Sequence, residues 1–266
     1  IAGSASSNTA TTGYTAGALG VDILIQAVPE LWNLSNVKGV QVANVDSGSI
    51  TPEILLNLSS LIQEALDDPY CQGAVATHGT DTLEESAIFL DLTIKTEKPV
   101  VVVGAMRPAT AISADGPMNL LEAVTLAGSP DARGRGTMVV LNDRIGSAFY
   151  MTKTHSNSLD TFKAVEQGYL GFFLDTKPLF YYPPVLPNGR VYFNVSGATE
   201  LPEVDILFGH QVLNPKLARS AVESGAKGLV LAGMGAGGWT NAGPSEIENL
   251  VKKYGTQVVV SSRTMG

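Results

Sequence analysis

The sequence predicts an α/β fold in two domains: a larger amino-terminal domain with a mostly parallel sheet and flanking helices, and a smaller carboxy-terminal α/β domain. Three observations lead to this prediction. Apolar runs alternate with amphipathic segments along the chain, as in strand–helix units. Several apolar runs, such as "VVVV" at 100–103, are continuous, which is typical of parallel strands buried on both faces. The proline-rich stretch "KPLFYYPPVLPNGR" then interrupts the rhythm within residues 175–203, as a linker or a surface hairpin would.

The strands are predicted from runs rich in Val, Ile and Leu. In the first domain they lie at 40–45, 73–77, 99–105, 137–141, 149–153 and 170–174, and in the second at 204–208, 228–232 and 257–261. Amphipathic spacing predicts helices between them, at 21–31, 51–66, 82–96, 117–128, 215–224 and 244–254. Thr51 is a typical N-cap, and Pro52 suits the first helical position.

The domain boundary is predicted at the proline-rich break. Residues 1–183 form the first domain, 184–203 a linker and 204–266 the second domain. The second domain is short, because the chain stops at Gly266 directly after a strand, and we expect it to be truncated. Residues 4–19 are nearly all small or hydroxylated, with a lone Tyr14, and taken alone they predict a flexible tail.

Composition excludes several classes of function. The net charge of -8 argues against nucleic acid or an anionic membrane as the main partner, since both favour basic surfaces. No apolar run approaches the roughly 20 residues that span a bilayer. A single cysteine, Cys71, forms no intramolecular disulfide, and no His/Cys cluster has zinc spacing. The sequence therefore predicts no zinc site.

Polar residues follow the predicted strands where ligands collect in α/β sheets. "THGTDT" at 77–82 comes directly before a helix, whose free N–H groups favour an anion or an oxyanion. Thr80 offers a hydroxyl there, and Gly79 allows close approach to the backbone. Asp81 has two interpretations, an ordinary helix cap or a substrate-binding group. Lys153 follows another strand and could act as a base only if it is desolvated or lies beside other cations.

Three other patterns are weaker. "GMGAGG" at 233–238 fits a dinucleotide-binding motif, but the next helix begins late and no acidic residue follows the next strand. His78, His155 and His210 share no metal spacing, and no G-x-S-x-G motif is present. We interpret His78 as a packed or hydrogen-bonded turn residue.

Three longer stretches carry a specific resemblance. "THGTDTLEESAIFLDLT", "KPVVVVGAMRPATAISADGPMNL" and "MTKTHSNSLDTFKA", in this order, resemble the L-asparaginase family of the bacterial type II and related fungal kind. The resemblance runs over the whole chain. It implies hydrolysis of the side-chain amide of L-asparagine to L-aspartate and ammonia through a threonine nucleophile and an acyl-enzyme. Lesser L-glutamine hydrolysis, no cofactor, and a homotetramer built as a dimer of dimers are also implied.

The resemblance also assigns roles to residues. Thr80, Asp81 and Lys153 match a catalytic constellation, in which the backbone N–H of Thr80 helps to stabilise the oxyanion. Tyr14 matches a tyrosine on a mobile lid. The resemblance therefore implies that residues 4–19 form a lid that opens and closes. The first nucleophile is expected immediately before Ile1.

Substrate contacts are implied as well. Ser47 matches a residue that binds the substrate α-carboxylate, Asp81 one that pairs with the α-ammonium, and the backbone of Ala105 one that contacts the side-chain amide. The chain departs from bacterial relatives at Gly48 and Gly238, where they carry Gln and Asn. These departures affect the expected substrate affinity and the asparagine-to-glutamine ratio. The family also continues beyond Gly266, with an acidic residue donated across the dimer.

Two other functions stay open: a non-catalytic amino-acid-binding homologue, and an amidase subunit of an amidotransferase. Glycosylation sequons at Asn33, Asn57 and Asn194, with the resemblance, favour a secreted or cell-wall location, with a cytoplasmic one as the alternative.

Overall fold

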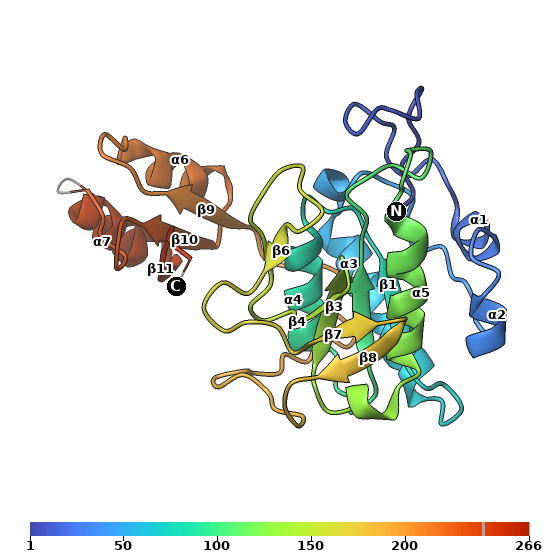
Figure 1. Ribbon diagram of the computed structural model, residues 1–266. Helices are drawn as coiled ribbons and strands as arrows, with labels where there is room; N and C mark the ends of the chain where they lie inside the picture. Colours follow the sequence, from blue (N-terminus) through green and yellow to red (C-terminus); the bar gives the residue numbers. More distant parts are fainter. Residues whose placement is uncertain (241–242, 266) are drawn as a thin grey trace. The chain divides into compact units, whose positions relative to one another are not determined.

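The computed structural model describes residues 1–240 and 243–265, so Gly266, where the predicted second domain ends, lies outside it. The chain divides into two compact units, Ile1–Thr199 and a smaller unit from Glu200 onward. Each unit is an α/β structure (Figure 1), which confirms the predicted fold class. The proline-rich segment contributes to the larger unit. Arg190 Nε donates to Asp91 Oδ2 at 2.8 Å, and the Phe193 N–H donates to the Leu92 carbonyl at 2.8 Å.

The larger unit is built on a mixed six-stranded sheet. Its order is β1-β2-β3-β4-β7-β8. These strands are β1 (Ala74–Thr77), β2 (Val100–Val103), β3 (Thr137–Leu141), β4 (Arg144–Ser147), β7 (Gly171–Leu174) and β8 (Lys177–Phe180). The first three strands are parallel, as the continuous apolar runs predict, and the other three pairings are antiparallel.

Strand β2 shows why its sequence is apolar at every position. Val101 and Val103 pack into one core, with helix α5 (Gly116–Ala127), whereas Val100 and Val102 pack into another on the opposite face, with α3 (Pro52–Asp67) and α4 (Leu83–Thr93). Because successive side chains of a strand point to opposite faces, a strand covered by helices on both sides needs apolar residues throughout. The helices lie on the two faces of the sheet in Figure 1.

The helix boundaries follow the capping signals. Thr51 Oγ1 accepts a hydrogen bond from the Ile54 N–H, and Pro52 begins α3, as the sequence predicts. The segment predicted as one helix over 21–31 is instead two, α1 (Val21–Gln26) and α2 (Leu31–Leu34), separated by Pro29. A proline lacks the N–H that a continuous helix needs.

Two tight hairpins explain the strands that sequence analysis missed. Asn142 and Asp143 connect β3 to β4 with φ values of 54° and 58°, and Asp175 and Thr176 connect β7 to β8 with φ values of 49° and 64°. Two-residue loops with positive φ at both positions match the twist of antiparallel strands, and Asn and Asp tolerate them. The interruption predicted over 175–203 therefore begins only after β8.

Two predicted strands were wrong or too long. Residues 40–45 form no strand, and Val40 and Val45 are exposed. The side chain of Gln41 accepts a hydrogen bond from the Val21 N–H and donates one to the Ala43 carbonyl, so this segment is held by a side chain rather than by a strand ladder. Residues 149–153 contain only the short β5 (Thr152–Lys153), which pairs with β6 (Phe162–Lys163).

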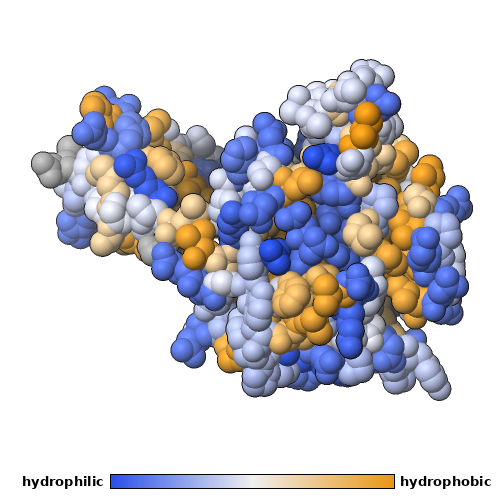
Figure 2. Space-filling model, in the orientation of Figure 1, coloured by the Kyte–Doolittle hydropathy of each residue, from blue (hydrophilic) through white to orange (hydrophobic). Residues whose placement is uncertain are grey.

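The smaller unit has a parallel sheet in the order β11-β10-β9. Its elements are β9 (Val204–Phe208), α6 (Lys216–Ser224), β10 (Gly228–Gly233), α7 (Gly243–Tyr254) and β11 (Gln257–Ser262). Its core joins both helices to one face of the sheet. Three side chains of β9 are exposed instead, Val204, Ile206 and Phe208. Figure 2 shows hydrophobic residues (orange) on the visible surface of this unit. None of the helices in the described part of the chain is both long and apolar enough to cross a membrane.

One buried acid lies against the sheet. Glu122 on α5 is 1% exposed, and its Oε2 has no hydrogen-bond partner within residues 1–240 and 243–265. Burial, followed by the hydrogen bond and charge of Asp143 in the β3–β4 turn, raises the pKa of Glu122 to about 8. The folded protein therefore keeps a proton that the unfolded chain releases near pH 4.3.

We expect Glu122→Gln to stabilise the protein only at higher pH. Between about pH 4.5 and 8 the folded state binds the extra proton, so the stability of the wild-type chain falls as pH rises, and Gln, which resembles the protonated acid, removes this loss. The variant should match wild type near pH 4.5 and exceed it at pH 8 by on the order of 3 kcal/mol. Urea unfolding at both pH values measures this. The exposed Glu64→Gln is the control, and an equal difference between wild type and E122Q at both pH values would contradict the assignment.

Candidate active site

The turn between β1 and α4 is the centre of the candidate site. The His78 N–H donates to the Val103 carbonyl at 2.8 Å, which continues the β1–β2 pairing one residue past the strand. Thr80 follows and is buried, with 5% of its surface exposed. The helix N-cap is Thr82, and neither its side chain nor that of Asp81 caps the helix. The interpretation of Asp81 as an ordinary cap is therefore wrong, because its carboxylate binds another partner.

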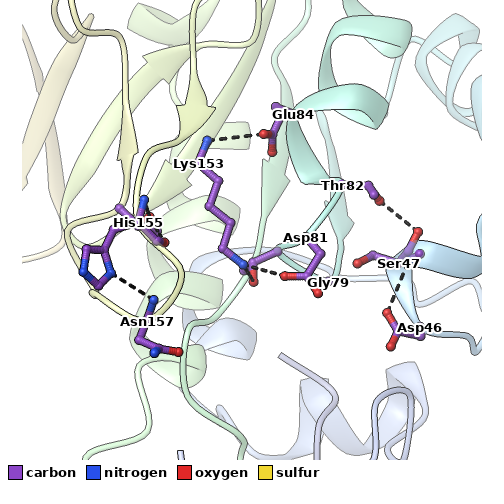
Figure 3. Close-up of polar contacts among 12 residues, drawn as sticks. Asp46, Ser47, Gly79, Asp81, Thr82, Glu84, Lys153, His155 and Asn157 are labelled. Atoms are coloured by element: carbon purple, nitrogen blue, oxygen red, sulfur yellow. Dashed lines mark hydrogen bonds and ion pairs between the residues drawn. The ribbon is translucent and has the colours of Figure 1, made fainter. Parts of the chain in front are cut away.

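That partner is Lys153 on β5. Its Nζ lies 2.6 Å from Asp81 Oδ1 and 3.1 Å from Thr80 Oγ1, as Figure 3 shows for the pair with Asp81. The lysine side chain is 15% exposed, whereas that of Asp81 is 71% exposed. The ammonium is therefore withdrawn from solvent, and most of the carboxylate stays open to a ligand.

The loop after Lys153 is ordered by a histidine. His155 Nδ1 accepts hydrogen bonds from the N–H groups of Asn157 and Ser158, both at 3.0 Å, and the first of these is drawn in Figure 3. The Thr154 N–H and Oγ1 both bind the Thr161 carbonyl, which closes the β5–β6 ribbon. These contacts fix the main chain of residues 154–161, which follow Lys153.

Ser47 lies against the Thr80 turn. It begins a single 3₁₀ turn, η1 (Ser47–Ser49), which Asp46 caps by accepting from the Gly48 N–H at 3.1 Å. Thr82 Oγ1 donates to the Ser47 carbonyl at 2.9 Å. A β-carbon on Gly79 would lie 2.9 Å from both Cβ and Oγ of Ser47, so only glycine allows the two turns to approach this closely.

Tyr14 belongs to the amino-terminal segment, and 39% of its surface is exposed. The Ser4 and Thr15 main chains form a bridge of two hydrogen bonds, at 3.0 and 2.9 Å, and the Tyr14 ring packs on Gly3. Burial first, and then the negative charges of Asp81 and Asp46, raises the pKa of Tyr14. The phenol is therefore held protonated beside these carboxylates.

Residues 4–19 are tied to the loop after β2 rather than free as a tail. The Ala109 N–H donates to the Gly3 carbonyl and the Ile112 N–H to the Asn8 carbonyl, both at 2.8 Å. The Ala5 N–H donates to Thr110 Oγ1 at 3.0 Å. The small and hydroxylated residues of this segment are therefore held against the loop that follows β2.

Ala105 is buried at the end of β2, and sequence analysis missed the two residues that shape its loop. Asp115 accepts from the N–H groups of Met106 and Arg107, both at 2.9 Å. Asn119 Nδ2 donates to the Gly104 carbonyl at 3.0 Å and to Asp115 at 3.1 Å. The sequence signal for these two residues was their spacing. Asp115 is the N-cap of α5, and Asn119 follows four residues later, one helical turn along.

His78 has a structural role, as predicted. Its Nδ1 lies 2.6 Å from the Gly79 carbonyl and its Nε2 lies 2.8 Å from Ser86 Oγ, so both ring nitrogens have partners. Burial lowers its pKa. Among the residues described, no group of three or more His, Cys, Asp or Glu side chains is placed to hold a metal ion.

The arrangement suits one kind of chemistry. Lys153 Nζ, largely shielded from solvent, contacts both a threonine hydroxyl and a carboxylate beside the turn that follows β1, an arrangement that can activate a hydroxyl group for attack on a carbonyl. Residues 1–186 match the family described as "Asparaginase, N-terminal", and residues 203–266 match "Glutaminase/Asparaginase C-terminal domain". The chain belongs to the asparaginase family.

Individual relatives agree with this assignment. The chain is 59% identical to "Probable L-asparaginase 3" of Schizosaccharomyces pombe, over all of this chain and 74% of the relative. It is 49% identical to "L-asparaginase 2" of Bacillus subtilis, over 99% of this chain and 70% of that one. A solved structure, "Probable Cytoplasmic L-asparaginase from Campylobacter jejuni", matches with a TM-score of 0.94 and 46% identity, over 99% of this chain and 80% of that chain. Both the fungal and the bacterial resemblance are confirmed.

We expect Gly79→Ala to weaken ligand binding more than turnover. The new β-carbon would push Ser47 away from the Thr80 turn, and overpacking of this kind typically corresponds to a roughly 5- to 100-fold change in an equilibrium constant. Calorimetry with L-aspartate measures the effect. Gly128→Ala, at the exposed C-cap of α5, is the control, because its added β-carbon would meet no atom closer than 3.7 Å. Equal affinities of the two variants would show that the close contact with Ser47 is not needed.

Proposed function

We propose that this chain is an L-asparaginase that hydrolyses the side-chain amide of L-asparagine to L-aspartate and ammonia, with lesser turnover of L-glutamine. The observation that carries the proposal is the contact of one ammonium, that of Lys153, with both Thr80 Oγ1 and Asp81 Oδ1. A free threonine hydroxyl is too weak an acid to react at neutral pH, and a lysine–carboxylate pair beside it can accept and pass on its proton.

The substrate is a zwitterion, and the site offers groups suited to both of its ends. The exposed part of the Asp81 carboxylate pairs with the α-ammonium, and Ser47, 5% exposed and in contact with Gly79, binds the α-carboxylate. The backbone of Ala105 and the N–H of Thr80 face the side-chain amide. A β-carbon on Gly104 would lie 2.9 Å from Thr80 Cγ2, so the ends of β1 and β2 are close enough for one small ligand to touch both.

The reaction has two halves. In the first, a threonine hydroxyl directly before Ile1 attacks the amide carbon, and ammonia leaves with the proton, which gives an acyl-enzyme. In the second, water attacks the acyl carbon, the bond to the threonine oxygen breaks and aspartate is released, while Thr80, Lys153 and Asp81 relay the proton of the water to that oxygen and restore its hydroxyl. Tyr14 orients the first nucleophile and closes the site. Its segment is hydrogen-bonded to the loop after β2, a contact that a lid could break and re-form.

The position of Ile1 supports this placement of the first nucleophile. A β-carbon on Gly116 would lie 3.4 Å from Ala105 Cβ and 3.8 Å from Ile1 Cα, so Ile1 is adjacent to the end of β2. A residue joined to Ile1 is therefore within reach of the loop that follows Ala105.

The deciding experiment is ammonia release from L-asparagine by protein with a verified threonine directly before Ile1. We expect turnover from this protein, a lower rate with L-glutamine, and a negligible rate from a matched protein with valine in place of that threonine. Binding of aspartate without ammonia release from the threonine-bearing protein would instead support the non-catalytic binding homologue.

Lys153→Met should lower kcat by at least about a hundredfold and change KM much less. Methionine fills a similar volume but cannot bind Thr80 or relay a proton, and general acid–base assistance typically contributes about 10²–10⁴-fold. Steady-state kinetics on L-asparagine measures both constants. Lys177→Met on β8, remote in sequence and exposed, is the control, and an unchanged kcat in K153M would remove the lysine from the mechanism.

We also propose that the protein assembles as a homotetramer, a dimer of dimers, and that it is secreted or held in the cell wall. Family resemblance supports the assembly, and the sequons at Asn33, Asn57 and Asn194, all exposed, support the location. Light scattering on the purified chain separates a homotetramer from the hetero-complex expected of an amidotransferase subunit.

A further inference from the structure

A carboxylate outside the proposed mechanism lies directly behind the catalytic lysine. Glu84 is the second residue of α4, three positions after Asp81. Its Oε1 accepts hydrogen bonds from the Lys153 main-chain N–H and from Thr152 Oγ1, both at 3.3 Å. In Figure 3 the lysine runs from Glu84 at its main chain to Asp81 at its ammonium. One short segment therefore holds the lysine at both ends.

Few hydrogen bonds connect the strand that carries Lys153 to the rest of the unit, although Met151 before it and Phe162 on its partner strand are buried in the core. Among the described strands, β5 pairs only with β6, in a two-stranded ribbon separate from the six-stranded sheet. Its hydrogen bonds to the body of the unit at this point are those to Glu84 and those of the Lys153 ammonium. A lysine side chain has a flexible stem of four carbons. The Lys153 ammonium therefore stays at Thr80 only if the main chain of Lys153 is fixed.

A simple helix-capping role does not account for Glu84. Acidic residues are favourable in the first turn of any helix, and Glu85 satisfies that preference equally well. Glu85 is exposed, whereas Glu84 turns inward, and its Oε2 is buried with no hydrogen-bond partner in the described part of the chain. An inward carboxylate with one unsatisfied oxygen is costly to retain, which indicates a use other than stability.

We propose that Glu84 is a positioning residue: it fixes the main chain of Lys153 so that the ammonium reaches Thr80 and Asp81. This inference rests on the proposed function of that site. The hydrogen-bond acceptor is what the role requires, and the negative charge is not, because both donors to Oε1 are neutral groups.

The test compares Glu84→Ala, Glu84→Gln and Glu85→Gln in the full chain. Glu84→Ala removes the acceptor, and we expect kcat on L-asparagine to fall roughly tenfold to a hundredfold, as small misplacements of catalytic groups do, with KM changed less than threefold or so. The pH profile of kcat should shift, because the lysine is no longer held against Asp81. Glu84→Gln keeps an acceptor oxygen and should restore kcat to within about threefold of wild type. Glu85→Gln should match wild type.

If Glu84→Ala fails to fold, Thr152→Val tests the same positioning role with a smaller perturbation. It removes one of the two hydrogen-bond donors to Glu84 and leaves Lys153 intact. A smaller fall in kcat, with an unchanged unfolding midpoint, is expected. Unchanged kcat in both Glu84→Ala and Thr152→Val, or a Glu84→Gln variant as impaired as Glu84→Ala, would overturn the positioning role. Wild-type protein that releases no ammonia would contradict the proposed function instead, so the two failures are distinguishable.

Discussion

The ammonium of Lys153 is the one group on which the rest of the site depends. It joins a ribbon outside the main sheet to the turn that follows β1, through Asp81 Oδ1 at 2.6 Å and Thr80 Oγ1 at 3.1 Å. The lysine is largely shielded from water, whereas 71% of the Asp81 side chain is exposed, so solvent screens this pair on one side only. The same contact orients the Thr80 hydroxyl and leaves the outer part of the Asp81 carboxylate open. In the proposed mechanism, the hydroxyl and the substrate-binding carboxylate therefore share a single positive charge.

Close approach of the main chain makes this arrangement possible. Gly79 allows the Ser47 turn to contact the Thr80 turn, and Gly104 allows the end of β2 to contact Thr80 and Leu83. At both positions a β-carbon would come within 2.9 Å of a neighbouring atom. Small residues at the strand ends therefore let the Ser47 turn, the Thr80 turn and the end of β2 approach one another closely.

Much of the fold could be predicted, because burial on two faces leaves a clear pattern. The "VVVV" of β2 and the caps of α3 are examples in which local sequence and final structure agree. The hairpins at Asn142-Asp143 and Asp175-Thr176 were missed because their signal is a backbone dihedral rather than a hydrophobic period. Residues 40–45 have the apolar alternation of a strand, but the side chain of Gln41 takes the hydrogen bonds that a ladder would make.

The site was predictable only in part, for a different reason. Thr80, Asp81 and Lys153 were identified through resemblance to a family, and the structure brings them within hydrogen-bonding distance. Asp115, Asn119 and Glu84 act by holding main-chain groups; a spacing of one helical turn was the sequence signal for the first two, and no such spacing marks Glu84. Glu84 in particular is indistinguishable in the sequence from its neighbour Glu85, and only the direction of the side chain separates them.

Because Asp81 and Glu84 both bind Lys153, the segment from Asp81 to Glu84 is restricted in length. Each residue of an α-helix turns about 100° from the one before, and α4 begins at Leu83, so inserting or deleting a residue between Leu83 and Glu84 would swing the Glu84 carboxylate away from Lys153. The side chains between Asp81 and Glu84 can vary, but the number of residues between these two acids is fixed, because both must bind Lys153. Homologous sequences should therefore show substitutions here and no gaps.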